Sequence, residues 1–333
     1  EPPPLPQRLP SGSDPMQIHH GWLNTEGADD PRMFYSSQTG EWKLVPIHFL
    51  PQKLLRACNK SPRHTSYQIQ LKNDQVNVIL IAGPSSSGKT IFSKRLTIQL
   101  LTEGISPFAL EMDNYFVDRK NTPLDEHGNY DFEHIDALNR ELLNEHIKDL
   151  TAGKEVQLRR YDFHQGLNKP GESVKLSPGQ MIILEGIHGL NPKLLEDIPA
   201  NQTFRIYVSC LTQLNLDRHN RISTTDTREL RRILRDARDR GYTAQQTISN
   251  WEMVRRGEKR HIFPYQENAD EMFNSALAYE LTALRPLVEP LLPQVPYGTN
   301  EYIEAKRLFK FLQWFLPIDH RFIPDNSVLR EFI

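Results

Sequence analysis

The chain has 333 residues, with 40 Lys and Arg against 42 Asp and Glu, so its net charge is −2 and its charged fraction is 25%. This near balance argues against a nucleic-acid coat protein or a polybasic membrane binder. Two cysteines, Cys58 and Cys210, are too few and too far apart for a disulfide framework or a cysteine zinc site. No apolar run approaches the ~20 residues of a membrane span. We therefore expect a globular, cytoplasmic protein without a membrane or nucleic-acid partner.

The first 70 residues give weak structural signals. Residues 1–15 hold six prolines, which predicts a flexible Pro-rich arm. Residues 16–70 carry scattered aromatic side chains without clear periodicity. We interpret this second segment as a small N-terminal extension or a truncated domain.

After this region, short apolar runs alternate with helical patterns. Val76–Ala82 is a β-branched apolar run ended by Gly-Pro, which is typical of a buried parallel strand. Lys89–Glu103 has the apolar spacing of a helix. The same reasoning predicts three further strands and two further helices: Phe108–Met112, Met181–Leu184 and Phe204–Val208, then Ala137–Leu150 and Glu301–Leu316. Strands that alternate with helices predict an α/β domain with a mainly parallel sheet over 71–290. A helical C-terminal extension is expected over 291–333, with Leu316 on its buried side.

The strongest motif follows the first predicted strand. It is a complete G-x-x-x-x-G-K-[ST] match, formed by Gly83, Pro84, Ser85, Ser86, Ser87, Gly88, Lys89 and Thr90. In such a loop the glycines let backbone N–H groups face a phosphate, the lysine reaches the terminal phosphates, and the threonine hydroxyl meets Mg²⁺. Because the motif lies between a predicted strand and a predicted helix, we favour a nucleotide-binding loop over a Gly/Ser-rich turn. The fold predicted is a P-loop NTPase with three α/β/α layers, and ATP and Mg²⁺ are the expected ligands.

Two acidic residues, Asp113 and Glu185, stand at the ends of later apolar runs. Open α/β sheets bind ligands at the carboxyl ends of their strands, so both carboxylates are expected to point toward the phosphate loop and the acceptor. There Asp113 can accept the proton of an acceptor hydroxyl, and Glu185 can orient Mg²⁺. The alternatives are a helix N-cap or turn role for Asp113 and a turn role for Glu185.

The segment Arg228–Arg240 contains six arginines, five of which recur at helical spacing opposite an apolar stripe. Guanidiniums stabilise a transferring phosphoryl group, so two or three of them are candidates for an Arg-rich lid. The alternative is a solvated helix face in which aspartates balance the charge. A second basic cluster, at 255–261, has the same two interpretations.

Several motifs in order resemble the uridine kinase / phosphoribulokinase family. They are the P-loop, MDNYF, YDFEHIDA, RRYDF, ILEGIHGL and RRILRDARDRG, and the resemblance spans about residues 75–285. Within the family, the chain is similar to bacterial uridine kinase-like proteins that carry a threonyl-tRNA-synthetase-like N-terminal region. That similarity rests on HNRISTTD, RRGEKRHIFPYQENADEMFNSAL and NSVLREFI.

The resemblance implies roles for individual residues. Asp113 would be the base that activates the acceptor, and Tyr161 would line the nucleoside pocket. Arg232, Arg235 and Arg240 would belong to a lid that closes over the phosphates, with the first two assisting catalysis.

Further acceptor-binding residues are expected around Asp113, namely Tyr115 and Glu133. Glu133 and Phe116 depart from characterised uridine kinases, which the resemblance implies have Asp and Tyr there. His164 stands near the position of their base-recognising His, but its spacing differs. We therefore expect weak activity on uridine and cytidine.

The sequence thus predicts a kinase that transfers the γ-phosphoryl of MgATP to a hydroxyl of a nucleoside-like small molecule. Two alternatives stay open: a phosphoribulokinase-like sugar-phosphate kinase, and a nucleotide-binding regulatory protein without kinase activity. A homo-oligomer is also left open.

Overall fold

The computed structural model describes residues 21–23, 33–36, 41–44, 62–70, 76–126, 128–163, 165–212 and 221–333. The predicted arm over 1–15 and His164 lie outside these residues. The chain divides into two compact units, Glu1–Ser61 and Pro62–Ile333. The first unit contains a three-stranded antiparallel sheet of β1 (Gly21–Leu23), β2 (Met33–Ser36) and β3 (Glu41–Leu44).

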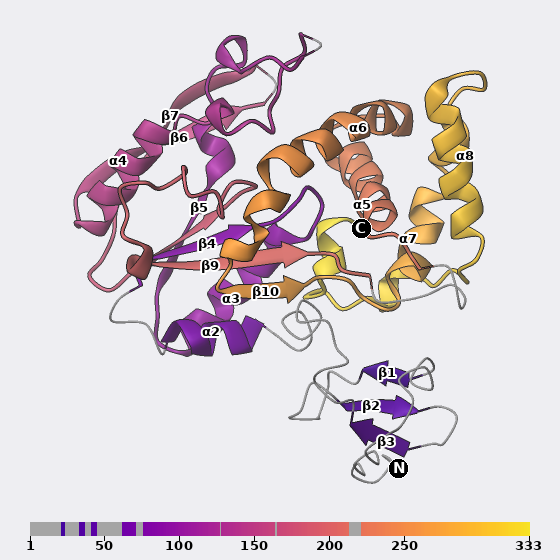
Figure 1. The fold of residues 1–333 in the computed structure, drawn as a ribbon, viewed down its shortest axis with the longest axis horizontal. Helices are drawn as coiled ribbons and strands as arrows, with labels where there is room; N and C mark the ends of the chain where they lie inside the picture. The colour runs from indigo at the N-terminus through magenta and orange to yellow at the C-terminus, as the bar shows by residue number, and fades with distance from the viewer. Residues whose placement is uncertain are drawn as a thin grey trace. The chain divides into compact units, whose positions relative to one another are not determined.

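The second unit is built on a five-stranded sheet in which every strand pair is parallel. Its strands are β4 (Val78–Ala82), β5 (Pro107–Glu111), β8 (Met181–Glu185), β9 (Thr203–Ser209) and β10 (Glu271–Asn274). Their order in space is β10–β9–β4–β8–β5, so β4 lies at the centre (Figure 1). The predicted mainly parallel sheet is confirmed.

Helices cover both faces of this sheet. They are α2 (Pro62–Gln70), α3 (Lys89–Thr102) and α4 (Arg140–Thr151). Ile79 and Ile81 of β4 pack in the apolar cluster of α2 and α3, whereas Val78 and Leu80 pack in the cluster of α4. Neighbouring residues of a strand point to opposite faces, so one short apolar run supplies both layers. The predicted three-layer α/β/α architecture is confirmed.

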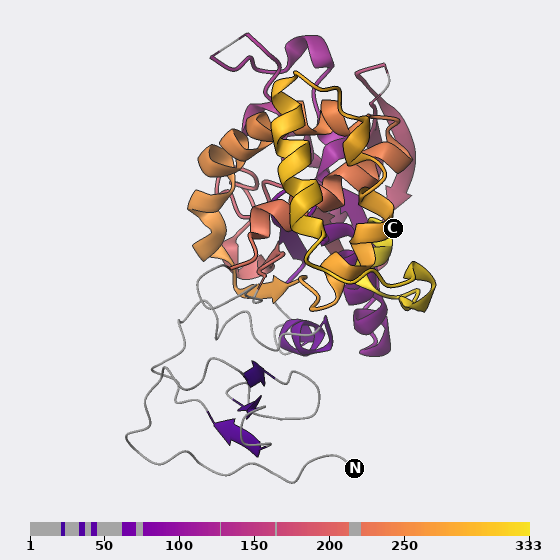
Figure 2. The same cartoon turned by 90° about the vertical axis from the view of Figure 1, so that its right-hand side faces the viewer.

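Four further helices form an apolar group beside the sheet. They are α5 (Thr224–Asp239), α6 (Ala244–His261), α7 (Glu280–Val288) and α8 (Asn300–Leu312). Figure 2 shows α8 along the outside of this group. Side chains cap three of these helices: the Ser223 hydroxyl accepts the Asp226 N–H, Thr243 and Gln246 form a capping box, and the Thr299 hydroxyl accepts the Tyr302 N–H. No helix in the described part of the chain is long and apolar enough to cross a membrane.

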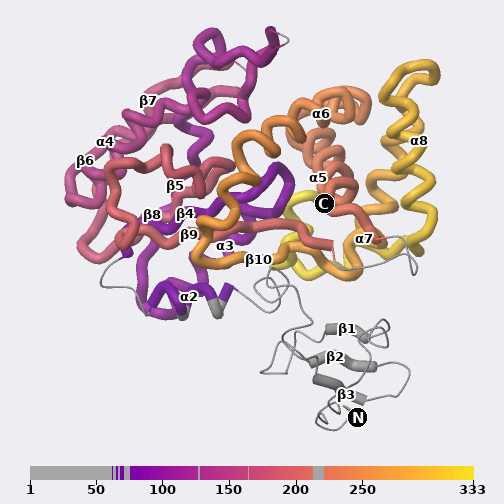
Figure 3. Tube along the Cα trace, viewed as in Figure 1, coloured from indigo at the N-terminus to yellow at the C-terminus, as the bar shows by residue number. Residues whose placement is uncertain are grey.

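Two predicted helix boundaries are wrong. α4 begins at Arg140 instead of Ala137, because the side chain of Asn139 caps it there. α8 ends at Leu312, and Leu316 is 83% exposed instead of buried. Pro317 disfavours helical geometry in the residue before it, so the amphipathic pattern runs on past the end of the helix. The chain then returns, and Figure 3 shows its yellow end beside α5.

A two-stranded antiparallel ribbon has no counterpart among the predicted strands. It consists of β6 (Glu155–Asp162) and β7 (Leu167–Lys175), with an irregularity between Gln157 and Arg159. β7 contains Pro170 and Gly171, residue types that disfavour a strand interior, so the sequence signal was weak. This ribbon positions Tyr161.

Candidate active site

Three neighbouring strands of the sheet end at the same level. Glu185, at the end of β8, lies in register with Ile81 of β4 and with Glu111 of β5. The phosphate loop follows β4, and Asp113 follows β5 in the short helix η3 (Met112–Tyr115). Because the carboxyl ends of parallel strands share one edge, the structure brings the loop, Asp113 and Glu185 together.

The phosphate loop has the backbone geometry of an anion cradle. Gly88 and Ser86 have positive φ angles of 88° and 57°. A Cβ atom on Gly83 would lie 2.0 Å from the carbonyl oxygen of Val208, so a larger residue does not fit beside β9. The hydroxyls of Ser86 and Ser87 are buried without a hydrogen-bond partner. Unpaired buried hydroxyls in a loop of this shape suit a phosphate group.

Lys89 and Thr90 open α3 directly after the loop. The Lys89 ammonium donates to the carbonyl oxygen of Pro84 at 3.3 Å, and the Thr90 hydroxyl lies 3.2 and 3.4 Å from the two carboxyl oxygens of Glu185. Burial raises the pKa of Glu185 to about 7; the Lys89 ammonium opposes this shift, and the Asp113 carboxyl adds to it. A hydroxyl and a carboxyl so placed suit a hard divalent cation, which would favour the charged form of Glu185.

Asp113 lies among cations at this edge. Burial raises its pKa above the ordinary value, and the positive charges of Lys89, Arg240 and Arg235 oppose that shift. A carboxylate whose proton affinity is raised by burial, yet which stays beside three cations, suits the acceptance of a proton from a nearby hydroxyl.

The first arginines of α5 are structural. Arg228 is buried, pairs with Glu258, and donates through Nε to the carbonyl oxygen of Ser85 at 3.0 Å. Arg231 is fully buried, pairs with Glu280, and donates to the carbonyl oxygen of Ser86 at 3.2 Å. We call Arg228 and Arg231 the paired arginines, because each has a carboxylate of its own. They hold the backbone of the phosphate loop.

Three later arginines meet one carboxylate. Arg232, Arg235 and Arg240 lie 3.3, 3.2 and 3.3 Å from Asp236, whose side chain is only 1% exposed. Arg232 also donates to the Ser85 hydroxyl at 2.6 Å. Burial and the neighbouring Arg235 guanidinium lower the pKa of Arg240, which reflects the crowding of positive charge. We call these three the shared arginines.

A match to a family model identifies the proteins to which this chain is related. The model of the phosphoribulokinase / uridine kinase family matches residues 78–280, from the start of β4 to the start of α7. The chain belongs to the phosphoribulokinase / uridine kinase family. It is therefore a P-loop kinase by family, and the match includes every predicted site residue. The predicted similarity to kinases with a threonyl-tRNA-synthetase-like N-terminal region stays a prediction.

Curated relatives in this family are kinases. The uridine kinase of Staphylococcus epidermidis is 31% identical over 198 residues, which cover 59% of this chain and 86% of the relative. The uridine kinase of Staphylococcus aureus is 32% identical over 194 residues, which cover 58% and 84%. A solved structure of a possible uridine kinase from Bacillus stearothermophilus aligns with a TM-score of 0.41 at 19% identity, covering 62% of this chain and 100% of that one.

The predicted acceptor tyrosines lie in different settings. Tyr115 has no exposed surface, and its hydroxyl lies 2.9 Å from Nδ1 of His146 in the core, so we leave it out of the proposed acceptor site. Tyr161 is 5% exposed and makes edge-to-face contacts with Phe116 and Phe163, at ring separations of 5.6 and 5.0 Å. Phe163 is 54% exposed, so this aromatic cluster reaches the surface.

Glu133 lies against α6 and faces the phosphate loop. A Cβ atom on Gly257 would be 2.3 Å from the Cβ of Glu133, so the glycine permits this close approach. Burial raises the pKa of Glu133 to about 7; the Glu258 carboxyl adds to the shift, and Arg232 and Lys89 oppose it. One of its carboxyl oxygens, Oε2, is buried without a hydrogen-bond partner. Glu133 therefore lies close enough to Lys89 and Arg232 for their positive charges to act on its carboxyl group.

Two carboxylates that hold the phosphate loop and the first turn of α3 were missed in the sequence. Glu258 accepts the backbone N–H of Ser85 at 3.1 Å, and Glu331 accepts that of Ile91 at 3.2 Å. A glycine just before Glu258, inside a helix, was a signal of close packing that could have drawn attention to it. No comparable signal marks Glu331, which lies in the short helix η10 (Val328–Glu331).

The basic cluster at 255–261 forms the last turns of α6. Arg256 and Arg260 lie 3.8 and 3.2 Å from Glu126. These two arginines therefore face an acidic segment of the same unit, and it is the acid within the cluster, Glu258, that contacts the phosphate loop.

Proposed function

We propose that this protein transfers the γ-phosphoryl group of MgATP to a hydroxyl of a nucleoside-like small molecule. The observation that carries the proposal is the shared arginines, three guanidiniums around one buried carboxylate, beside the phosphate loop and Asp113. An arrangement with more positive charge than its own carboxylate balances suits a polyphosphate.

Each residue at the edge has a proposed task. Gly83 to Thr90 would bind the phosphates, with Thr90 and Glu185 also holding Mg²⁺. When bound, MgATP supplies the phosphoryl group and neutralises charge on its oxygens. Asp113 accepts the proton of the acceptor hydroxyl, and its raised pKa makes it a stronger base than an exposed aspartate. Arg232 and Arg235 hold the charge that develops on the phosphoryl oxygens, while Arg240 binds the phosphates.

The acceptor side supports a neutral, planar molecule. The rings of Phe116, Tyr161 and Phe163 contact one another, and Phe132 joins them at 6.1 Å from Phe116. Such rings suit stacking on a nucleobase. The carboxyl of Glu133 can accept hydrogen bonds from ribose hydroxyls but would repel a phosphate on the acceptor.

An ATP-consumption assay across nucleosides, sugar phosphates and vitamins tests the proposal. We expect ADP release that depends on a nucleoside, with uridine and cytidine weaker than the true acceptor. Lys89→Ala should abolish turnover by weakening MgATP binding, because it removes the ammonium that neutralises the terminal phosphates. Lys94→Ala is the matched control, since Lys94 is exposed on the same helix.

Other outcomes separate the alternatives. Turnover of a sugar phosphate with no nucleoside active would favour the phosphoribulokinase-like alternative and contradict the nucleoside acceptor. Nucleotide binding with no acceptor-dependent turnover at all would favour a regulatory role and contradict the kinase proposal.

A further inference from the structure

Helices α5, α6 and α8 line an open cavity of about 510 Å³ that contains none of the residues proposed above for catalysis. Asp226 and Glu229 line it from α5, Trp251 and Glu252 from α6, and Glu304 and Arg307 from α8. A cavity of this volume is large enough for a small organic molecule.

The lining of this cavity has an excess of negative charge. Five carboxyl groups and two guanidiniums line it. Arg307 lies 2.7 Å from Asp226 and 2.5 Å from Glu304, and Arg255 lies 3.8 Å from Glu252. Both guanidiniums are thus engaged with other carboxylates. The remaining two acids, Glu229 and Glu301, lie within ion-pair distance of neither guanidinium.

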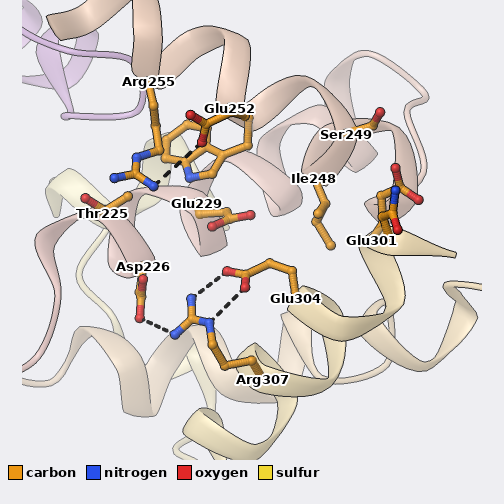
Figure 4. Close-up of a pocket in the computed structure, with 12 residues that line it drawn as sticks. Thr225, Asp226, Glu229, Ile248, Ser249, Glu252, Arg255, Glu301, Glu304 and Arg307 are labelled. Atoms are coloured by element: carbon orange, nitrogen blue, oxygen red, sulfur yellow. Dashed lines mark hydrogen bonds and ion pairs between the residues drawn. The ribbon is translucent and has the colours of Figure 1, made fainter.

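Glu229 is the residue that indicates a ligand in this cavity. Its side chain is 2% exposed, and its Oε1 atom is buried without a hydrogen-bond partner. Figure 4 shows it at the centre of the cavity, between the Glu252–Arg255 pair and the Glu304–Arg307 pair. A buried carboxyl oxygen with no partner is costly for the folded state, so its retention points to a partner that binds there. The indole N–H of Trp251, another buried lining group, also has no partner.

The chemistry of the cavity selects the kind of ligand. Within the described residues, no three His, Cys, Asp or Glu side chains are placed to hold a metal ion. An ammonium group, in contrast, needs only one or two carboxylates and benefits from a neighbouring aromatic ring. We propose that this cavity binds a small organic cation of the linear diamine or polyamine class, with one ammonium group paired to Glu229.

The proposed site adjoins the residues that hold the phosphate loop. The ring of Trp251 lies beneath the guanidiniums of Arg228 and Arg232, at 5.4 and 6.0 Å from its centre. Both arginines contact Ser85 in the loop. A cation beside Trp251 is therefore one side chain away from the phosphate site, although its binding does not depend on kinase activity.

Calorimetric titration of the nucleotide-free full chain with spermidine at low ionic strength tests the proposal. We expect saturable binding that salt weakens. Glu229→Gln keeps the size of the side chain and removes its charge, so it should weaken binding roughly tenfold or more. Glu172→Gln, on the exposed surface of β7, is the matched control and should leave the affinity unchanged.

Proton release gives a second, independent readout. Burial raises the pKa of Glu229 to about 8; the carboxyls of Glu304 and Asp226 add to the shift, and Arg307 opposes it. The α6 side of the cavity presents Glu252 and Arg255. At pH 7 Glu229 is therefore mostly protonated, and an ammonium group that favours its charged form should release the proton. The binding heat should then differ between buffers of different ionisation enthalpy.

The Glu229→Gln variant also serves as a control for correct folding. Because Gln resembles the protonated form of Glu229, Glu229→Gln should fold normally and show no proton release. No saturable binding of spermidine, or equal affinity in wild type and Glu229→Gln, would overturn the proposal. So would a concentration-dependent dimer that Glu229→Gln dissociates, because a basic side chain of a second copy would then be the occupant.

Discussion

The paired arginines and the shared arginines follow one another along α5 and its C-cap residue, Arg240, yet their electrostatic settings are opposite. Arg228 and Arg231 are buried, and each is balanced by its own carboxylate. The shared arginines meet Asp236 together and are more accessible, with up to 45% of the side chain exposed at Arg240. A buried cation that is paired with its own carboxylate has no net charge left to attract an anionic ligand. Cations that share one carboxylate keep part of their positive charge for such a ligand.

This difference shows that an arginine-rich helix has two separate tasks. The paired arginines fix the backbone of the phosphate loop, and we propose that the shared arginines bind what the loop holds. Substitutions in the first set should therefore change stability, and substitutions in the second should change catalysis.

The largest effect is expected from Arg231→Ala. It leaves Glu280 buried without its cation, which should lower the free energy of unfolding by ~3–5 kcal/mol in urea titrations. Arg232→Ala is the matched comparison, and it should lower that free energy by less, because Arg235 and Arg240 still meet Asp236. Equal losses in the two variants would remove the distinction between the sets.

Asp113→Asn should lower kcat by ~10²-fold or more while MgATP affinity stays nearly constant, because an amide cannot accept the hydroxyl proton. Single-turnover kinetics with the acceptor found in the screen would measure it. A collapse of MgATP binding with normal residual turnover would instead make Asp113 a structural residue, and the charges around it would need another explanation.

Arg235→Ala should lower kcat roughly 10-fold to 100-fold with little change in stability, since two shared arginines remain. Parallel measurement of kcat, MgATP affinity and melting temperature would separate this effect from unfolding. A wild-type kcat would mean that the shared arginines form only a solvated helix face.

A further effect is expected on the pH dependence of stability. The pKa of Glu133 and that of Glu185 are raised from 4.5 to about 7. Between pH 4.5 and pH 7 these two carboxyl groups are deprotonated in the unfolded chain but keep their protons in the folded protein. The free energy of unfolding should therefore fall as pH rises from about 4.5 to about 7.

Arg232 lowers the pKa of Glu133, so Arg232→Ala should extend that decline to higher pH. Urea unfolding of the nucleotide-free protein at pH 5, 6, 7 and 8 would show it. Glu133→Gln should flatten the decline, and an unchanged slope in both variants would contradict this assignment.

Local signals in the sequence were enough to predict four of the five strands of the sheet and its phosphate loop, whereas β10 was not predicted. The apolar run before Gly83 and the glycine and lysine spacing after it depend on neighbouring residues alone, and β4 and α3 form where they are predicted. The positions of Asp113 and Glu185 could also be predicted, because residues that follow parallel strands lie at the same edge of the sheet.

Features that depend on distant partners could not be predicted. The helical spacing of the arginines does not reveal whether a side chain pairs with a distant carboxylate, such as Glu280, or faces solvent. Arg231 could therefore not be distinguished from Arg235. Tyr115 looked like a stacking residue because its partner, His146, is 31 residues away. The polar sequence of β7 becomes a strand only through its pairing with β6.

The contacts of Glu258 with the phosphate loop and of Glu331 with the first turn of α3 also bear on the order of folding. These carboxylates are 173 and 240 residues away in sequence from the backbone N–H groups they accept. During synthesis the loop and the start of α3 emerge early, but together they cannot acquire these hydrogen-bond partners until both later segments have emerged and docked. Closing such long chain segments is a slow step, so the loop should be among the last parts of the unit to reach its final geometry.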